Sequence, residues 1–124
     1  MATVLTQKGE EWIVDKLDET VDTKAEWIGW GTGTGAAKGS TDLNTPATEG
    51  RVQGTITQPV ADKARCVGTI TADGTKTISE AGLFNAQGTG SPPSGGDIII
   101  HGDFTGIPLN ANDQIEFTVD LEIT

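Results

Sequence analysis

The segment that most constrains the fold is the end of the chain, residues 113–124, where polar and apolar side chains alternate without a break from Gln114 onward. The apolar positions are Ile115, Phe117, Val119, Leu121 and Ile123, and the polar positions are Gln114, Glu116, Thr118, Asp120 and Glu122. Successive side chains of a strand point to opposite faces of its sheet. The pattern therefore predicts a strand, Asp113–Thr124, with five apolar side chains on a core and five polar ones in solvent.

Other segments are rich in apolar or β-branched residues and are bounded by Gly or Pro, which is typical of short strands. These segments are Glu26–Gly31, Val52–Thr57 (closed by Pro59), Arg65–Ala72, Thr75–Phe84 and Asp97–Phe104. The dipeptide Asp73-Gly74 is a strong hairpin signal and predicts that the strands on either side of it pair with each other. The apolar run Ile98–Ile100 predicts a strand that is buried on both faces.

Turn-forming sequence separates these strands, and the chain contains 17 Gly and 19 Thr. Loops are predicted over Gly31–Ser40 and Ala86–Gly96, a short helical turn within Thr41–Gly50, and a further turn at Pro108–Asn112. Six or seven short strands with no strand–helix alternation fit an antiparallel arrangement. We therefore predict a single all-β domain over residues 1–124, a β-sandwich or jelly roll, with residues 26–124 forming the sandwich.

One short helix is expected at residues 9–19, because apolar side chains recur there at helical spacing and acidic residues lie where its N-terminus would be. The helix either caps the core or lays its apolar face on a partner. Residues 1–8 precede it as an extended arm that is able to pair with the sheet edge of another chain. The candidate partner-contact residues in these two segments are Thr3, Val4, Leu5, Trp12, Ile13 and Leu17.

The net charge of −10 argues against nucleic acid or an anionic membrane surface as a partner, since both attract basic proteins. No Lys or Arg follows Lys76, although seven carboxylates do. We expect the acidic C-terminal strands either to face water or to meet a basic partner.

Cysteine and histidine are too scarce for several classes of site. Cys66 is the single cysteine, which excludes an intramolecular disulfide, and with His101 as the single histidine a Cys/His zinc site is excluded as well. Cys66 is most simply a small buried hydrophobic residue. The N-terminal residues do not resemble a signal peptide and no apolar run has the length of a membrane span, so we expect a soluble protein made in a reducing compartment.

Motifs for catalysis or cofactor binding are weak. The Gly31–Ala36 segment matches only a relaxed dinucleotide-binding pattern and is followed by no helix that would hold a phosphate, so a structural loop is favoured and no cofactor is expected. His101 and Asp103 share a strand face and could form a base or half a metal site, but a surface or interface histidine is favoured. No ordered calcium loop is found. We expect no enzymatic activity and no bound metal.

Several segments together resemble small virion structural proteins of tailed bacteriophages. They are Gly9–Leu17, Trp27–Gly33, Ile78–Asn85 and Asp113–Val119, of which the Ile-x-Glu-Ala-Gly-Leu-Phe run, Ile78–Phe84, is the most specific. Proteins of this kind are described either as capsid decoration (cement) proteins or as tail-associated proteins. The resemblance implies a structural role without catalysis, so it transfers no catalytic residues.

If the resemblance holds, the leading expectation is a decoration protein on the capsid exterior, made in the host cytoplasm. It would stabilise the lattice by contacts with the major capsid protein or other virion proteins, as a homo-oligomer, a dimer or trimer. The first alternative is a module of the tail, baseplate or fibre that contacts the host or other tail proteins. The second is a binding module or small enzyme unrelated to a virion.

Overall fold

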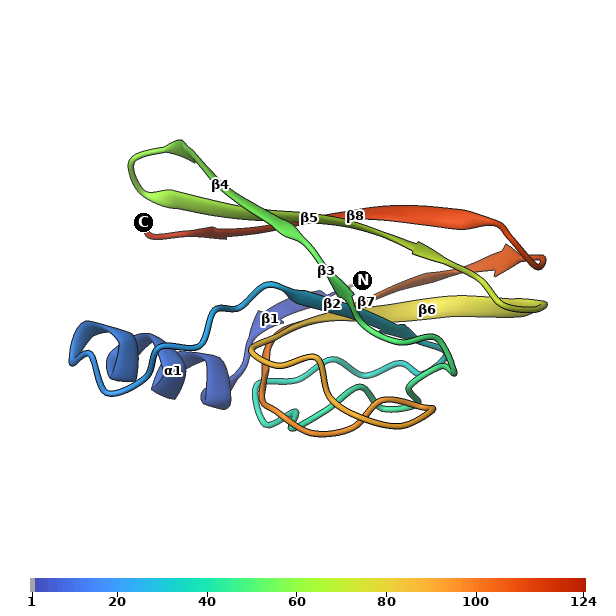
Figure 1. The fold of residues 1–124 in the computed structure, drawn as a ribbon, viewed down its shortest axis with the longest axis horizontal. Helices are drawn as coiled ribbons and strands as arrows, with labels where there is room; N and C mark the ends of the chain where they lie inside the picture. Colours follow the sequence, from blue (N-terminus) through green and yellow to red (C-terminus); the bar gives the residue numbers. More distant parts are fainter. Residues whose placement is uncertain (1) are drawn as a thin grey trace.

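The computed structural model describes residues 2–124, which form an all-β sandwich of two antiparallel sheets with one short helix (Figure 1). Sheet A has the order β1-β7-β6-β2-β3, and sheet B has the order β4-β5-β8. The strands are β1 (Ala2–Leu5), β2 (Trp27–Gly31), β3 (Val52–Gln53), β4 (Thr55–Val60), β5 (Lys63–Thr71), β6 (Lys76–Phe84), β7 (Ile98–Leu109) and β8 (Gln114–Glu122), and the helix is α1 (Gln7–Leu17). The predicted fold class is confirmed.

The predicted hairpin at Asp73-Gly74 is wrong, because β5 and β6 lie in different sheets. The turn between them carries the chain from sheet B to sheet A, and β5 pairs instead with β8 over nine residues, from Lys63↔Glu122 to Thr71↔Gln114. This pairing places the apolar side chains of β5 and β8 on the same face, above sheet A. Tertiary packing thus selects a partner that the local turn signal does not specify.

Proline does not end strands where the sequence predicts it. Pro59 lies within β4, where the register shifts, and β4 is an edge strand that tolerates the missing N–H. Strand β7 continues through Pro108 to Leu109, so the turn comes later than predicted. Residues 41–50 contain no helical turn and are held to sheet A by an isolated bridge between Gly31 and Pro46.

Helix α1 begins two residues earlier than predicted because Thr6 caps it. The Thr6 hydroxyl accepts a hydrogen bond from the Gly9 N–H at 2.9 Å and donates to the Ile98 carbonyl at 2.6 Å. Thr6 is fully buried. A side chain on Gly9 would collide with the Ile99 carbonyl oxygen, so glycine permits the close approach of the helix to β7.

Residues 2–5 are not the free arm that the sequence suggests, and Met1 lies outside the described residues. They form β1, which pairs with β7 of the same chain from Ala2↔Asp103 to Leu5↔Ile100. The chain itself provides the sheet edge that a partner was expected to supply.

Sheet A is covered on both faces, which confirms the prediction for the Ile98–Ile100 run. Ile99 and Ile100 belong to the main core between the sheets, with Trp30, Ile70 and others. Ile98 packs with Leu43 and Phe84 on the opposite face, which the loops of residues 32–50 and 85–97 cover (Figure 1).

Candidate functional site

A buried polar network lies on the loop-covered face of sheet A and is centred on Glu80. Its carboxylate accepts backbone hydrogen bonds from Gly33, Asn44 and Thr45 at 2.7–2.9 Å, and it contacts His101 Nε2 at 2.8 Å. Glu80 and His101 are both 0% exposed. Burial by itself would raise the pKa of Glu80, but the hydrogen bonds from His101 and the three amides lower that pKa below its ordinary value.

The prediction that His101 is a surface or interface histidine is wrong. Its Nδ1 lies 2.9 Å from the Ser40 hydroxyl, which in turn accepts from the Ala37 N–H. Nε2 donates to the Glu80 carboxylate, which can only accept, and Nδ1 lies within hydrogen-bond distance of the Ser40 hydroxyl.

Asp103 does share the strand face of His101, as predicted, but the two side chains have different partners. Asp103 accepts from the backbone N–H groups of Gly35, Ala36 and Ala2, each at 2.9 Å. These hydrogen bonds lower the pKa of Asp103, and the one from Ala36 lowers it most. The two carboxylates thus fasten the predicted loop of residues 31–40 to sheet A.

The chain of groups Ser40–His101–Glu80 has the composition of a hydrolase triad, but its geometry serves the loop. The serine hydroxyl contacts His101 and Ala37. Neither it nor His101 nor Glu80 is among the residues that line the four hollows described for residues 2–124. The hydrogen bonds of the network join the loop of residues 33–45 to sheet A.

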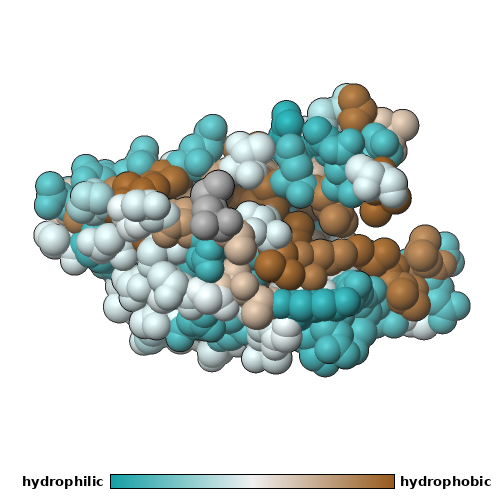
Figure 2. All heavy atoms as spheres, turned by 180° about the vertical axis from the view of Figure 1, so that it is seen from behind, coloured by the Kyte–Doolittle hydropathy of each residue, from teal (hydrophilic) through white to brown (hydrophobic). Residues whose placement is uncertain are grey.

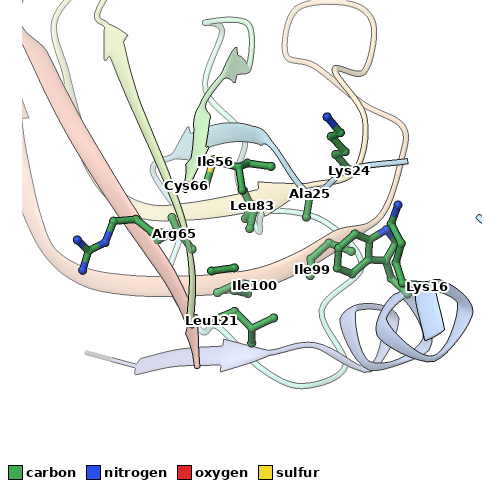
Figure 3. Close-up of a pocket in the computed structure, with 13 residues that line it drawn as sticks. Lys16, Lys24, Ala25, Ile56, Arg65, Cys66, Leu83, Ile99, Ile100 and Leu121 are labelled. Atoms are coloured by element: carbon green, nitrogen blue, oxygen red, sulfur yellow. The ribbon is translucent and has the colours of Figure 1, made fainter. Parts of the chain in front are cut away.

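The opposite face of sheet A is different, because the space between the two sheets opens to solvent. A hollow of about 420 Å³ lies between α1, sheet A and the overhanging end of sheet B. Figure 2 shows hydrophobic residues on both walls of the notch at this end of the molecule. The close-up shows Cys66, Leu83 and Ile100 on its floor and walls, with Lys16 and Lys24 at one end (Figure 3).

A second hollow, of about 220 Å³, continues along β8. It shares Leu83, Ile100 and Val119 with the first, so the two form one groove, which we call the inter-sheet groove. Phe104 of β7 and Phe117 of β8 line its second half, and both are only partly buried. The alternation predicted for β8 is confirmed, but its apolar face is half-exposed, and Ile123 is 63% exposed.

Some carboxylates of the acidic C-terminal strands pair with Lys and Arg from earlier in the same chain. The expectation that these carboxylates either face water or meet a basic partner therefore left out a third possibility. Arg65 contacts Asp120 at 2.8 Å, and Lys63 contacts Glu122 at 3.7 Å, both across the β5–β8 pair. Glu116 lies opposite Thr69 and forms no ion pair with another described residue.

Lys16 and Lys24 are exceptions among the eight Lys and Arg of the chain. Within residues 2–124 the other six contact carboxylates, whereas these two contact none and both line the inter-sheet groove. Lys16 instead lies 5.7 Å from the ring centre of Trp12.

The predicted partner-contact residues separate into several environments. Trp12 and Thr3 line the two halves of the inter-sheet groove, and Leu5 packs against the main core. Val4 and Ile13 are half-buried, and Leu17 is 80% exposed. Cys66 is buried, as predicted, and burial raises the pKa of its thiol.

The exposed edge of β8 is a candidate site that the sequence does not predict, because alternation reveals a strand without showing which of its edges is paired. Each sheet has two edges, and only the order of the strands shows that β8 is one of them.

Comparisons with known proteins give no relative: no family model, no curated protein and no solved structure matches the chain. In the part of the chain that the structure describes, no group of three or more His, Cys, Asp or Glu side chains is placed to hold a metal ion. No helix in that part is long and apolar enough to cross a membrane.

Proposed function

We propose that this chain is a structural virion protein of a tailed bacteriophage, and specifically a capsid decoration protein that binds the major capsid protein and stabilises the capsid lattice. The sequence resemblance in Trp27–Gly33 and Ile78–Phe84 is the source of the proposal. The role is one of protein–protein contact on the capsid exterior, without catalysis, nucleic acid or membrane.

One structural observation supports the proposal: the inter-sheet groove lies open beside β8, whose outer edge is unpaired. Exposed apolar surface next to a free strand edge is a feature of surfaces that bind other proteins. The hydrogen bonds of Ser40, His101 and Glu80, which join a loop to sheet A, support a structural role for these residues.

Residues in the segments that resemble virion proteins also make buried contacts that stabilise the fold, which suits a rigid binding module. Glu80, within Ile78–Phe84, fixes the loop of residues 33–45. Trp30, within Trp27–Gly33, is 2% exposed and donates from its indole to Glu49 at 2.9 Å. A decoration protein has to keep its shape while it links neighbouring subunits, and a dimer or trimer would do so symmetrically.

The test is to count this protein in purified particles and to compare particles with and without it. Copies in the hundreds, together with depleted capsids that assemble but rupture at lower temperature or on osmotic shock, are expected of a decoration protein. Depleted particles that are as robust as complete ones would contradict the proposal. A copy number of a few to a few dozen would instead place the protein in the tail, baseplate or fibre.

A further inference from the structure

We propose that the free edge of β8 is a docking site for an extended segment of a partner protein, which joins sheet B as a fourth strand and carries apolar residues alternating with Lys or Arg. The inference deepens the proposed function and rests on it for the identity of the partner as a virion protein.

The four sheet edges in residues 2–124 differ in how well they could accept a strand. Strand β3 has two residues and β1 has four, while β4 contains Pro59 and a shift of register. Strand β8 has nine residues, with no proline, no lysine and an unbroken register against β5. Natural proteins protect exposed edges with short length, proline, bulges or charged side chains, above all lysine. Strand β8 lacks the first three and lysine, and its charged residues, Glu116, Asp120 and Glu122, are all acidic.

The backbone of β8 offers hydrogen bonds at alternate residues. At its two ends, Ile123 N–H donates to Asp62 and the Asp113 carbonyl accepts from Ala72, both toward the β5 side. In an antiparallel pair the residues that bond a given neighbour alternate along the strand. The odd-numbered residues of β8 therefore bond to β5, and the N–H and C=O groups of residues 114, 116, 118, 120 and 122 point to the free edge.

The inner side of an added strand would lie over apolar surface. Sheet B has three strands against five in sheet A, and beyond β8 the groove exposes parts of β7 and β1. Thr3, Phe104 and Phe117 line this stretch. Strands pair about 4.8 Å apart, so the next strand would cover the second hollow and direct every other side chain into it. Those side chains should be apolar.

The charge of the outer side argues for a basic partner and against a second copy of this chain. Two copies of β8 paired antiparallel about Thr118 would place Glu116 opposite Asp120, and like charges directly opposite are destabilising. Each copy also carries a net charge of −10. Lys or Arg in an added strand would instead lie beside Glu116, which has no cation of its own among the described residues.

The experiment uses the whole protein and a peptide of alternating Val and Lys as long as β8, with a Val–Glu peptide as the matched control. Amide hydrogen exchange is followed by NMR. The N–H groups of Glu116, Thr118 and Asp120 should exchange quickly in the free protein and become protected by the Val–Lys peptide alone. Protection at β1 or β4 instead, or equal protection by both peptides, would overturn the proposal.

Thr118→Pro removes an N–H that the fold does not use, and proline is tolerated where a strand's N–H faces solvent. It should weaken binding of the Val–Lys peptide and of depleted particles about tenfold, because a partner carbonyl loses its donor. Thr118→Val keeps the N–H and a similar shape, so it should bind as the unmodified protein does. Unchanged binding by Thr118→Pro would reject β8 as the docking edge.

Glu116→Lys provides a second variant that leaves the strand backbone intact. It should weaken binding of the Val–Lys peptide and strengthen binding of the Val–Glu peptide. Unchanged binding of both peptides would contradict the charge argument. Protection of β8 that rises with protein concentration in the absence of peptide would identify a second copy as the occupant and overturn the basic partner. If the Val–Lys peptide binds at β8 but this chain is missing from virions, the proposed function is refuted and the docking edge is retained.

Discussion

The two faces of sheet A are covered in opposite ways. On one face, the loop of residues 32–50 supplies hydrogen bonds to Glu80, His101 and Asp103. Arg51 in turn binds the carbonyls of Ala86 and Gly95 in the loop of residues 85–97. On the other face, three strands cover five, and a groove of apolar side chains remains open. No buried side-chain nitrogen or oxygen of residues 2–124 lacks a hydrogen-bond partner. The buried polar side chains on the loop-covered face of sheet A, which we call the closed face, are therefore all satisfied.

This difference separates what holds the fold from what is available for binding. Polar groups that are fully satisfied in a buried site fix one arrangement of the chain, because leaving any of them unpaired is costly. Apolar side chains that are only half-buried gain further from contact with a partner. We therefore expect substitutions on the closed face to reduce stability and substitutions along β8 to reduce binding.

The largest effect is expected for Glu80→Ala on the closed face. The change leaves His101 and the amides of Gly33, Asn44 and Thr45 without their shared acceptor. A buried donor left without its acceptor typically costs about 1–3 kcal/mol, so a total of about 3–5 kcal/mol is expected for these four donors. Urea denaturation should show a loss of this size in the free energy of unfolding. A loss below about 1 kcal/mol would mean that the network is not a main support of the fold.

Phenylalanines on the two faces provide the next contrast. Phe84 is fully buried, with the Arg51 guanidinium 3.5 Å from its ring centre, and Phe84→Ala should cost about 3–5 kcal/mol. Phe117 is half-buried and packs edge-on against Trp30, with 6.3 Å between the ring centres. Phe117→Ala should therefore lower the free energy of unfolding by about 1–2 kcal/mol. Thermal or urea melts measure both variants. Equal losses would show that the inter-sheet side is as closed as the loop side.

Acid should weaken the closed face in a graded way. The pKa values of Glu80 and Asp103 are lower in the folded protein than their ordinary values of 4.5 and 3.8. Their contribution to stability is therefore complete above those ordinary values and declines as the pH falls through the lower folded values. Unfolding in urea between pH 7 and pH 3 should show this decline, and Asp103→Asn should reduce its slope. A pH-independent stability would contradict the assignment.

The smallest effect is expected for Asp120→Asn on the outer face of sheet B. Asp120 pairs with Arg65 through two hydrogen bonds, at 2.8 and 3.1 Å, but both side chains are solvent-accessible. Exposed ion pairs contribute little to stability and are screened by salt. The variant should unfold at the same urea concentration as the unmodified protein in moderate salt. A clear loss that persists in high salt would show that the β5–β8 pair depends on this contact.

The sequence predicts the strands better than their arrangement. The alternation in residues 113–124 specifies β8 and its apolar face, and the run Ile98–Ile100 specifies a strand with two buried faces. It does not specify the sheets, because the turn signal at Asp73-Gly74 shows where the chain reverses and not whether it stays in the same sheet; here the chain crosses from sheet B to sheet A. The pairing of β5 with β8 depends on contacts between residues that are distant in the sequence.

The polar network was only partly foreseeable. His101 and Asp103 share a face by the period of two, but Glu80 joins them only because β6 pairs with β7, and Ser40 only because the loop of residues 33–45 folds over that face of sheet A. A carboxylate within the apolar run Ile78–Phe84 was the available signal, since a charged residue in such a run has to find partners. Its partners are mostly backbone amides, which no sequence pattern identifies.

A reconstruction of intact virions at side-chain resolution is the most direct test of the central claim that sheet B is completed by another protein. The expected result is this chain on the capsid exterior with a strand of the capsid protein beside β8, its apolar side chains in the inter-sheet groove and its basic ones near Glu116. A capsid-bound protein whose β8 edge and groove face solvent would contradict that claim. Virions that lack the chain altogether would contradict the proposed function.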